Sequence, residues 1–120
     1  MQYINFKKPY LFLKNFPQKL NNHYQKKSQF NLKVTNKSIN KKDYDPVTNF
    51  DKSFEKYIRS IIHKSFPLDS IVGEELKDKH SSNNYKWSID PIDGTRAFVI
   101  GAPTWSNLIS LSHKEKPILG

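Results

Sequence analysis

The sequence predicts an α/β chain in which one long amphipathic helix stands among several short strands. Apolar residues recur at helical spacing over residues 48–65. Two short apolar stretches, 69–76 and 86–90, have the length of strands, and each of them runs into acidic residues. Residues 104–120 favour two further strands around a Lys-Glu-Lys turn.

The first third of the chain predicts less regular structure. Residues 3–30 mix apolar and lysine positions, and Pro9 and Pro17 each disfavour helix continuation, so we expect one or two short, imperfect helices. Residues 30–38 alternate apolar and polar positions, which favours a short strand. Residues 36–45 are polar and lysine-rich, which is typical of a mobile loop. The side chains expected to face inward are Phe30, Leu32 and Val34.

The strongest local signal is the helix predicted over residues 48–65. Thr48 or Asn49 can cap its N-terminus, and Pro67 is expected to end it. Its apolar residues return every three or four positions and so share one face, which predicts burial of that face. They are Phe50, Phe54, Tyr57, Ile58, Ile61 and Ile62.

The elements that follow are short. The first apolar stretch is expected to stop at Gly73, before two glutamates, and residues 77–85 form a polar loop. The second strand, 86–90, is expected to end at Pro91, and residues 95–101 predict one or two helical turns.

Charge and composition limit the classes of protein. Residues 1–42 carry ten lysines and no acid, whereas residues 43–120 have a net charge of −1, so the overall +9 comes from an N-terminal lysine-rich segment. Lysine outnumbers arginine eighteen to two, which favours a solvated surface over a nucleic-acid arm. The absence of cysteine excludes disulfides and thiolate metal sites. No apolar run of about 18 residues and no secretory signal is present, so we expect a cytoplasmic protein without membrane spans.

Three acids follow the two predicted central strands: Glu74, Asp90 and Asp93. Brought together, their charges would repel one another unless a cation lay among them. Carboxylate oxygens without neighbouring His or Cys favour Mg²⁺, Mn²⁺ or Ca²⁺ over zinc. Because Pro91 has a restricted φ, the Asp-Pro-Ile-Asp turn can present both aspartates and the Ile92 carbonyl to one side. The alternative is that Asp90 and Asp93 are ordinary turn and cap acids.

Gly94 and Thr95 then open the next predicted helix. Free backbone N–H groups at a helix N-terminus attract phosphate oxygens. Metal-binding acids beside such a helix start would hold a phosphate ester from two sides, an arrangement that favours a hydrolase.

The segment WSIDPIDGTRAF resembles the W-x-x-D-P-[IL]-D-G-T signature of the inositol monophosphatase family of Mg²⁺-dependent phosphatases. GEE and DPVTNFD upstream resemble further elements of this family, in the expected order, and the resemblance spans residues 30–120. DGTRAF followed by G-x-PTW is most similar to the histidinol-phosphatase branch. The resemblance implies a layered αβαβα sandwich, of which residues 43–120 would form the N-terminal, metal- and phosphate-binding α+β part. A later W-D-x-A motif of the family is not found, so we expect a truncated phosphatase.

The resemblance also implies roles for individual residues. Thr95 and Asp51 would form the pair that orients the attacking water, and Glu74 would contact the same water. Glu75 is expected to lie outside the ligand set, Thr48 and Asp45 to be structural, and Arg96 to be either a substrate contact or an exposed residue. The implied metal ligands are Glu74, Asp90, the Ile92 carbonyl and Asp93. The implied phosphate-binding residues are Asp93, Gly94 and Thr95.

The function implied is hydrolysis of a small phosphate monoester by water that two or more Mg²⁺ ions activate. A truncated chain would have impaired activity, and would need a separately encoded C-terminal half or self-association to complete its site. We also expect poor solubility of the isolated chain, since part of its sheet would lack a partner. Two alternatives remain at this point: a catalytically inactive remnant, and an RNA-associated regulatory protein that uses the basic N-terminus.

Overall fold

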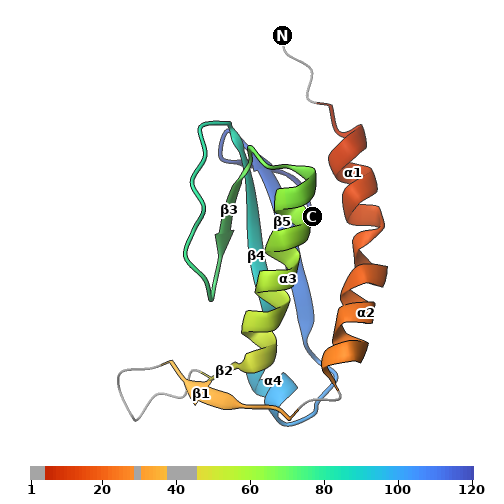
Figure 1. Ribbon diagram of the computed structural model, residues 1–120, viewed down its shortest axis with the longest axis vertical. Coiled ribbons are helices and arrows are strands. Elements are labelled where there is room, and N and C mark those ends of the chain that lie inside the picture. Colours follow the sequence, from red (N-terminus) through yellow and green to blue (C-terminus); the bar gives the residue numbers. More distant parts are fainter. Residues whose placement is uncertain (1–4, 29–30, 38–45) are drawn as a thin grey trace.

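A computed structural model of the protein describes residues 5–28, 31–37 and 46–120. A four-stranded sheet carries a long helix on one face, and two shorter helices lie alongside that helix (Figure 1). The helices are α1 (Lys7–Lys14), α2 (Phe16–Lys27), α3 (Asn49–Ser65) and α4 (Thr95–Val99). The strands are β1 (Val34–Asn36), β2 (Pro46–Thr48), β3 (Ser70–Gly73), β4 (Tyr85–Asp93), β5 (Ser106–His113) and β6 (Lys116–Leu119).

Helix α3 confirms the prediction for residues 48–65, and it begins at a capping box. The hydroxyl of Thr48 accepts hydrogen bonds from the backbone N–H groups of Phe50 and Asp51, and the Asp51 carboxylate accepts the N–H of Thr48. Thr48, rather than Asn49, is therefore the cap. The helix ends at a cap residue, Phe66, directly before the predicted terminator Pro67.

The apolar face of α3 packs on the inner face of the sheet. Ile58, Ile62 and Trp87 are fully buried, and Phe54 and Leu111 are almost so. Phe16, at the start of helix α2, adds its buried ring to the same cluster. Burial of large side chains in one contiguous cluster supplies the main driving force for this fold.

The sheet has the order β3-β4-β5-β6, in which β3 and β4 are parallel and the other neighbours are antiparallel. Side chains that alternate with the core residues face the opposite side, where Val72, Ser88 and Leu108 line an open groove. The two strands predicted within 104–120 are confirmed as β5 and β6. The turn between them uses positive φ at Lys114 and Glu115.

The N-terminal expectations are confirmed in part. Helices α1 and α2 are the two short helices, but Pro9 and Pro17 lie in their first turns, where proline costs no helical hydrogen bond. Strand β1 covers only part of the predicted 30–38 and is exposed throughout, so the inward orientation expected for Leu32 and Val34 is wrong. These side chains face solvent because β1 pairs only with β2, outside the main sheet. Phe30 and most of the predicted 36–45 loop lie outside the described residues.

The prediction that the second strand ends at Pro91 is also wrong. Strand β4 continues to Asp93, because a bulge between Asp90 and Asp93 lets the proline sit where it donates no ladder hydrogen bond. None of the helices in the described part of the chain combines the length and apolar character needed to cross a bilayer.

Candidate metal- and phosphate-binding site

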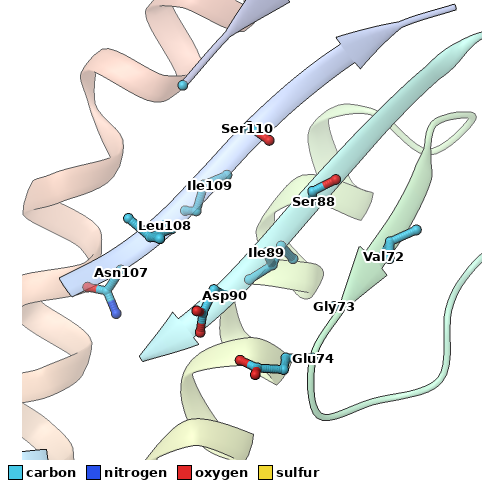
Figure 2. A pocket seen from close by; sticks show the side chains of 11 residues that line it. Val72, Gly73, Glu74, Ser88, Ile89, Asp90, Asn107, Leu108, Ile109 and Ser110 are labelled. Atoms are coloured by element: carbon cyan, nitrogen blue, oxygen red, sulfur yellow. The ribbon is translucent and has the colours of Figure 1, made fainter. Parts of the chain in front are cut away.

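The parallel pairing of β3 with β4 brings Glu74 beside Asp90. Gly73, the last residue of β3, pairs with Ile89, so the next residue on each strand is an acid. Figure 2 shows the two carboxylates facing one another at the end of the open groove. Since parallel strands end at the same edge of a sheet, a register set by buried residues delivers both acids to one place.

The environment of Glu74 disfavours its charged form. Partial burial raises the pKa of Glu74 to about 7, and the hydrogen bond and charge of Asp90 act in the same direction, with a smaller contribution from the charge of Asp51. Lys37 opposes the shift, with its Nζ 3.9 Å from the Glu74 carboxylate. A cation bound beside these carboxylates would stabilise the charged form of Glu74, which burial and Asp90 disfavour.

Asp90 is the second acid of this pair. Its Oδ1 is buried and accepts no hydrogen bond from the described protein atoms. An unpaired carboxylate oxygen in a buried position costs about 1–3 kcal/mol or more, so such atoms are rare in stable proteins. A cation bound between Glu74 and Asp90 would satisfy this oxygen.

The bulge in β4 changes the direction of the second aspartate. Asp90 pairs with Leu108 and Asp93 with Ser106, so three steps on β4 correspond to two steps on β5. A regular strand would turn residues three apart to opposite faces, whereas the extra residue returns Asp93 to the side of Asp90. Buried Pro91 forms part of this bulge, and its carbonyl accepts a hydrogen bond from the side chain of Asn107.

Gly94 makes the turn from β4 into α4. It has φ +88°, and a Cβ placed there would lie 2.9 Å from the carbonyl oxygen of Thr104. Both the left-handed conformation and the lack of space require glycine at this position. The backbone N–H groups of Gly94 and Thr95 therefore follow the acids directly, at the start of a five-residue helix.

Thr95 links α4 to the start of α3. Its hydroxyl lies 3.1 Å from Asp51 Oδ1 and 3.1 Å from the carbonyl oxygen of Ile92. Asp51 is 1% exposed, and its other oxygen is occupied by the backbone N–H and the hydroxyl of Thr48. The capping box of α3 thus fixes the carboxylate to which the Thr95 hydroxyl can donate.

The structure gathers some of the predicted residues more closely than others. Glu74 and Asp90 face each other, and Asp51 and Thr95 form a hydrogen-bonded pair. Asp93 and Arg96 are exposed, the latter on α4. No group of three or more acids and histidines lies close enough to hold one metal ion within residues 5–28, 31–37 and 46–120. The acidic centre shown is therefore a carboxylate pair.

Three nearby residues were not singled out by the sequence. Glu55 is buried on α3 behind Gly73, Asn107 bonds the bulge, and the Nζ of Lys37 lies 3.1 Å from Glu75. An acid one position from the buried face of an amphipathic helix, four residues before an arginine, was the available signal for Glu55. The contacts of Asn107 and Lys37 depend on how the strands pair, and no local pattern in the sequence indicates them.

The fold and the acids at the sheet edge together define an α/β protein that presents carboxylates beside a glycine turn and a short helix. The sequence profile of the inositol monophosphatase family matches residues 11–120. The chain belongs to the inositol monophosphatase family.

Individual proteins show the same relationship. The bifunctional phosphatase IMPL2 of Arabidopsis thaliana is 44% identical over 84 residues, which are 68% of this chain and 24% of that protein. A histidinol-phosphatase of Chlorobaculum parvum is 44% identical over 82 residues, or 68% of this chain and 32% of that protein. The crystal structure of an IMPase/NADP phosphatase complexed with Mg²⁺ and phosphate superposes with a TM-score of 0.80 at 19% identity, covering 94% of this chain and 42% of the other. The chain thus spans about a quarter to a third of the length of these curated relatives, and it shares the fold of the solved enzyme.

Proposed function

We propose that this protein takes part in the Mg²⁺-dependent hydrolysis of a small phosphate monoester. The observation that carries the proposal is the unpaired, buried Oδ1 of Asp90 beside Glu74, whose pKa is raised by burial and by Asp90 itself. A bound cation would stabilise both carboxylates, which supports the proposal.

The residues present fit Mg²⁺. This ion prefers hard oxygen ligands and usually binds proteins through one or two carboxylates, with water and substrate phosphate completing its shell. Glu74 and Asp90 would supply the two carboxylates, and the Ile92 carbonyl and Asp93 would lie on the same side of β4. Bound there, magnesium would neutralise charge on the phosphoryl oxygens and make water a better nucleophile at neutral pH, and a second ion would share this task.

Asp51 and Thr95 would orient the attacking water. The Thr95 hydroxyl donates a hydrogen bond to the Asp51 carboxylate, which leaves the lone pairs of that hydroxyl free to accept a hydrogen bond from water. A water held on Thr95 and on Glu74 would have its own lone pair fixed in direction, which lowers the entropic cost of attack on phosphorus.

The phosphate group would lie at the start of α4. The N–H groups of Gly94 and Thr95 are the donors that follow directly from the metal-binding strand, and Asp93 would bring a metal-bound phosphate oxygen into their reach. Arg96, exposed one position further on, would contact the alcohol part of the substrate. Because a relative is named histidinol-phosphatase, histidinol phosphate is the first substrate to test.

The remaining part of the site would come from further chain. The relatives are several times longer than the segment they share with this sequence, so we propose that a continuing or separately encoded segment, or a second copy, completes the site. Such a segment would add metal ligands and determine substrate choice.

Phosphate release from several phosphomonoesters, with and without Mg²⁺, tests the proposal. Mg²⁺-dependent turnover that Asp90→Asn abolishes, while Asp78→Asn leaves it unchanged, would support it, because Asp78 is an exposed acid of the polar loop. Calorimetric Mg²⁺ titration of the same proteins separates binding from chemistry. Binding without turnover would support an inactive remnant, and absence of both would contradict the assignment.

A further inference from the structure

Glu55 is the one charged side chain of α3 with 0% exposure. Its Oε1 accepts the backbone N–H of Glu75 at 2.8 Å, and its Oε2 accepts the N–H of Leu76 at 2.7 Å. Both amides lie in the turn directly after Glu74. The two backbone donors satisfy the hydrogen-bonding capacity of this buried carboxylate, and the carboxylate in turn holds the backbone of Glu75 and Leu76 in place.

Gly73 shows how closely the two elements approach. A Cβ at this position would lie 2.4 Å from Oε1 and 2.8 Å from Oε2 of Glu55, with no escape because the carboxylate is enclosed. Since the φ of Gly73 is not positive, the reason for glycine here is space alone. The carboxylate thus rests against the backbone on both sides of Glu74.

Arg59, one helical turn after Glu55, extends the contact. Its Nε donates to Glu55 Oε2 at 3.1 Å, and its two terminal nitrogens donate to the carbonyl oxygens of Lys77 and Leu76 at 2.8 Å and 3.1 Å. Glu55 and Arg59 together therefore bind both N–H and C=O groups of residues 75–77, which leaves the backbone of that segment little conformational freedom.

Glu74 itself has few restraints of its own. Half of its side chain is exposed, and its cationic neighbour Lys37 is 3.9 Å away. Its position next to Asp90 consequently depends on the backbone before it, held by β3, and the backbone after it, held by Glu55 and Arg59. Groups that orient a metal ligand affect metal affinity although they do not touch the ion.

We propose that Glu55, supported by Arg59, is a positioning residue that holds the Gly73–Leu76 turn and so sets Glu74 against Asp90 for metal binding. The inference rests on the proposed function for its metal, whereas the restraint on the turn stands on the geometry alone. A buried ion pair is by itself weak evidence for stability, and here its charge has a further use in fixing a ligand.

Glu55→Gln tests the inference, because a glutamine can accept through one oxygen only and would turn its amide against one of the two N–H groups. We expect faster hydrogen exchange at the amides of Glu75 and Leu76, and a Mg²⁺ affinity lower by roughly 10- to 100-fold. Asp69→Asn is the matched control, since Asp69 is also buried and accepts two donors, Trp87 Nε1 and the Asn83 amide, at the other end of β3. The control is expected to lower stability without changing Mg²⁺ affinity.

Hydrogen exchange by NMR and calorimetric Mg²⁺ titration on the full chain separate the outcomes. Unchanged exchange at both amides overturns the inference, and so does faster exchange with unaltered Mg²⁺ affinity. If the unsubstituted protein binds no Mg²⁺, the proposed function fails, and the restraint on the turn is still judged by exchange. Should Glu55→Gln not fold, Arg59→Gln removes only the two carbonyl contacts and one carboxylate contact, and the same two measurements apply with smaller expected changes.

Discussion

The hydroxyl of Thr95 has one proton and two acceptors, each 3.1 Å away: the Asp51 carboxylate and the Ile92 carbonyl. A charged acceptor is favoured over a neutral one, so the proton is expected to point to Asp51. That choice leaves the Ile92 carbonyl oxygen free for another partner, as its proposed role as a metal ligand requires.

Replacing Thr95 by valine is expected to destabilise the protein by about 1–3 kcal/mol, because buried Asp51 would lose the hydroxyl that donates to its Oδ1 while the side-chain shape at residue 95 stays nearly the same. Urea-induced unfolding measures this free energy. Thr95→Ser keeps the hydroxyl and should retain most of the stability. Equal midpoints for the valine and serine variants would contradict the contribution of the Thr95 hydroxyl to stability.

The raised pKa of Glu74, about 7, predicts that Mg²⁺ affinity increases as the pH rises through neutrality. Below that pH a proton occupies the carboxylate and competes with the cation, so affinity should change by up to about tenfold per pH unit. Calorimetric titration at about pH 6 and about pH 8 measures the difference. In Glu74→Gln we expect weaker binding and a much flatter pH dependence.

The same pKa has the opposite consequence for the metal-free protein. Because the folded state holds the Glu74 proton more tightly than the unfolded chain, this contribution to stability is present below about pH 4.5 and is lost as the pH rises to about 7. The effect is expected to be small, since half of the side chain is exposed. A stability that rises over this interval in Glu74→Gln relative to the unsubstituted protein would agree with this sign.

At the scale of elements, α3 supports both the core and the site. Its apolar face includes Ile58 and Ile62, whereas its first turns supply Asp51 and Glu55 to the acidic region. A change in the packing of this helix would therefore displace Asp51 and Glu55 as well as the apolar side chains, since all of them are attached to one rigid backbone.

Ile58→Ala should lower the free energy of unfolding by about 2–5 kcal/mol, because Ile58 is fully buried and its removal leaves a cavity between α3 and the sheet. Chemical denaturation followed by circular dichroism gives the value. Ser60→Ala, on the exposed side of the same helix, should change it by no more than about 0.5 kcal/mol. A similar loss in both variants would contradict the dominant role of packing at Ile58.

Elements with a strong local period could be predicted from the sequence. The helix over 48–65 and the strands after residue 104 follow from apolar spacing that their own residues carry. The bulge at Pro91 could not, because it depends on the pairing of β4 with β5 and on the Asn107 side chain. The sequence pointed to Glu74, Asp90 and the Asp51–Thr95 pair through a motif. It gave no sign of the bonds from Glu55 to the backbone of Glu75 and Leu76, because these amides lie about twenty residues away along the chain.

At the scale of the whole molecule, the two faces of the main sheet differ. One face carries α3 and the core, while along the other runs the open groove, where Leu108 is 48% exposed beside Val72 and Ser110. No helix in the described part of the chain contributes a residue to the lining of this groove. Exposed apolar surface on a sheet favours association.

We therefore expect the purified chain to associate as its concentration increases, and Leu108→Lys to reduce this association. Sedimentation velocity over a range of concentrations measures it. Leu68→Lys is a suitable control, since Leu68 is more exposed than Leu108 but lies outside the groove. A concentration-independent monomer before any substitution would contradict the expectation.

The bulge in β4 also limits how this sequence can diverge. Three steps on β4 lie opposite two on β5, so deletion of either Pro91 or Ile92 would remove the bulge and bring the two aspartates two positions apart on a regular strand, with the carbonyl groups between them displaced. Conservative substitutions within residues 90–93 should thus be tolerated far more often than any change in the length of this segment.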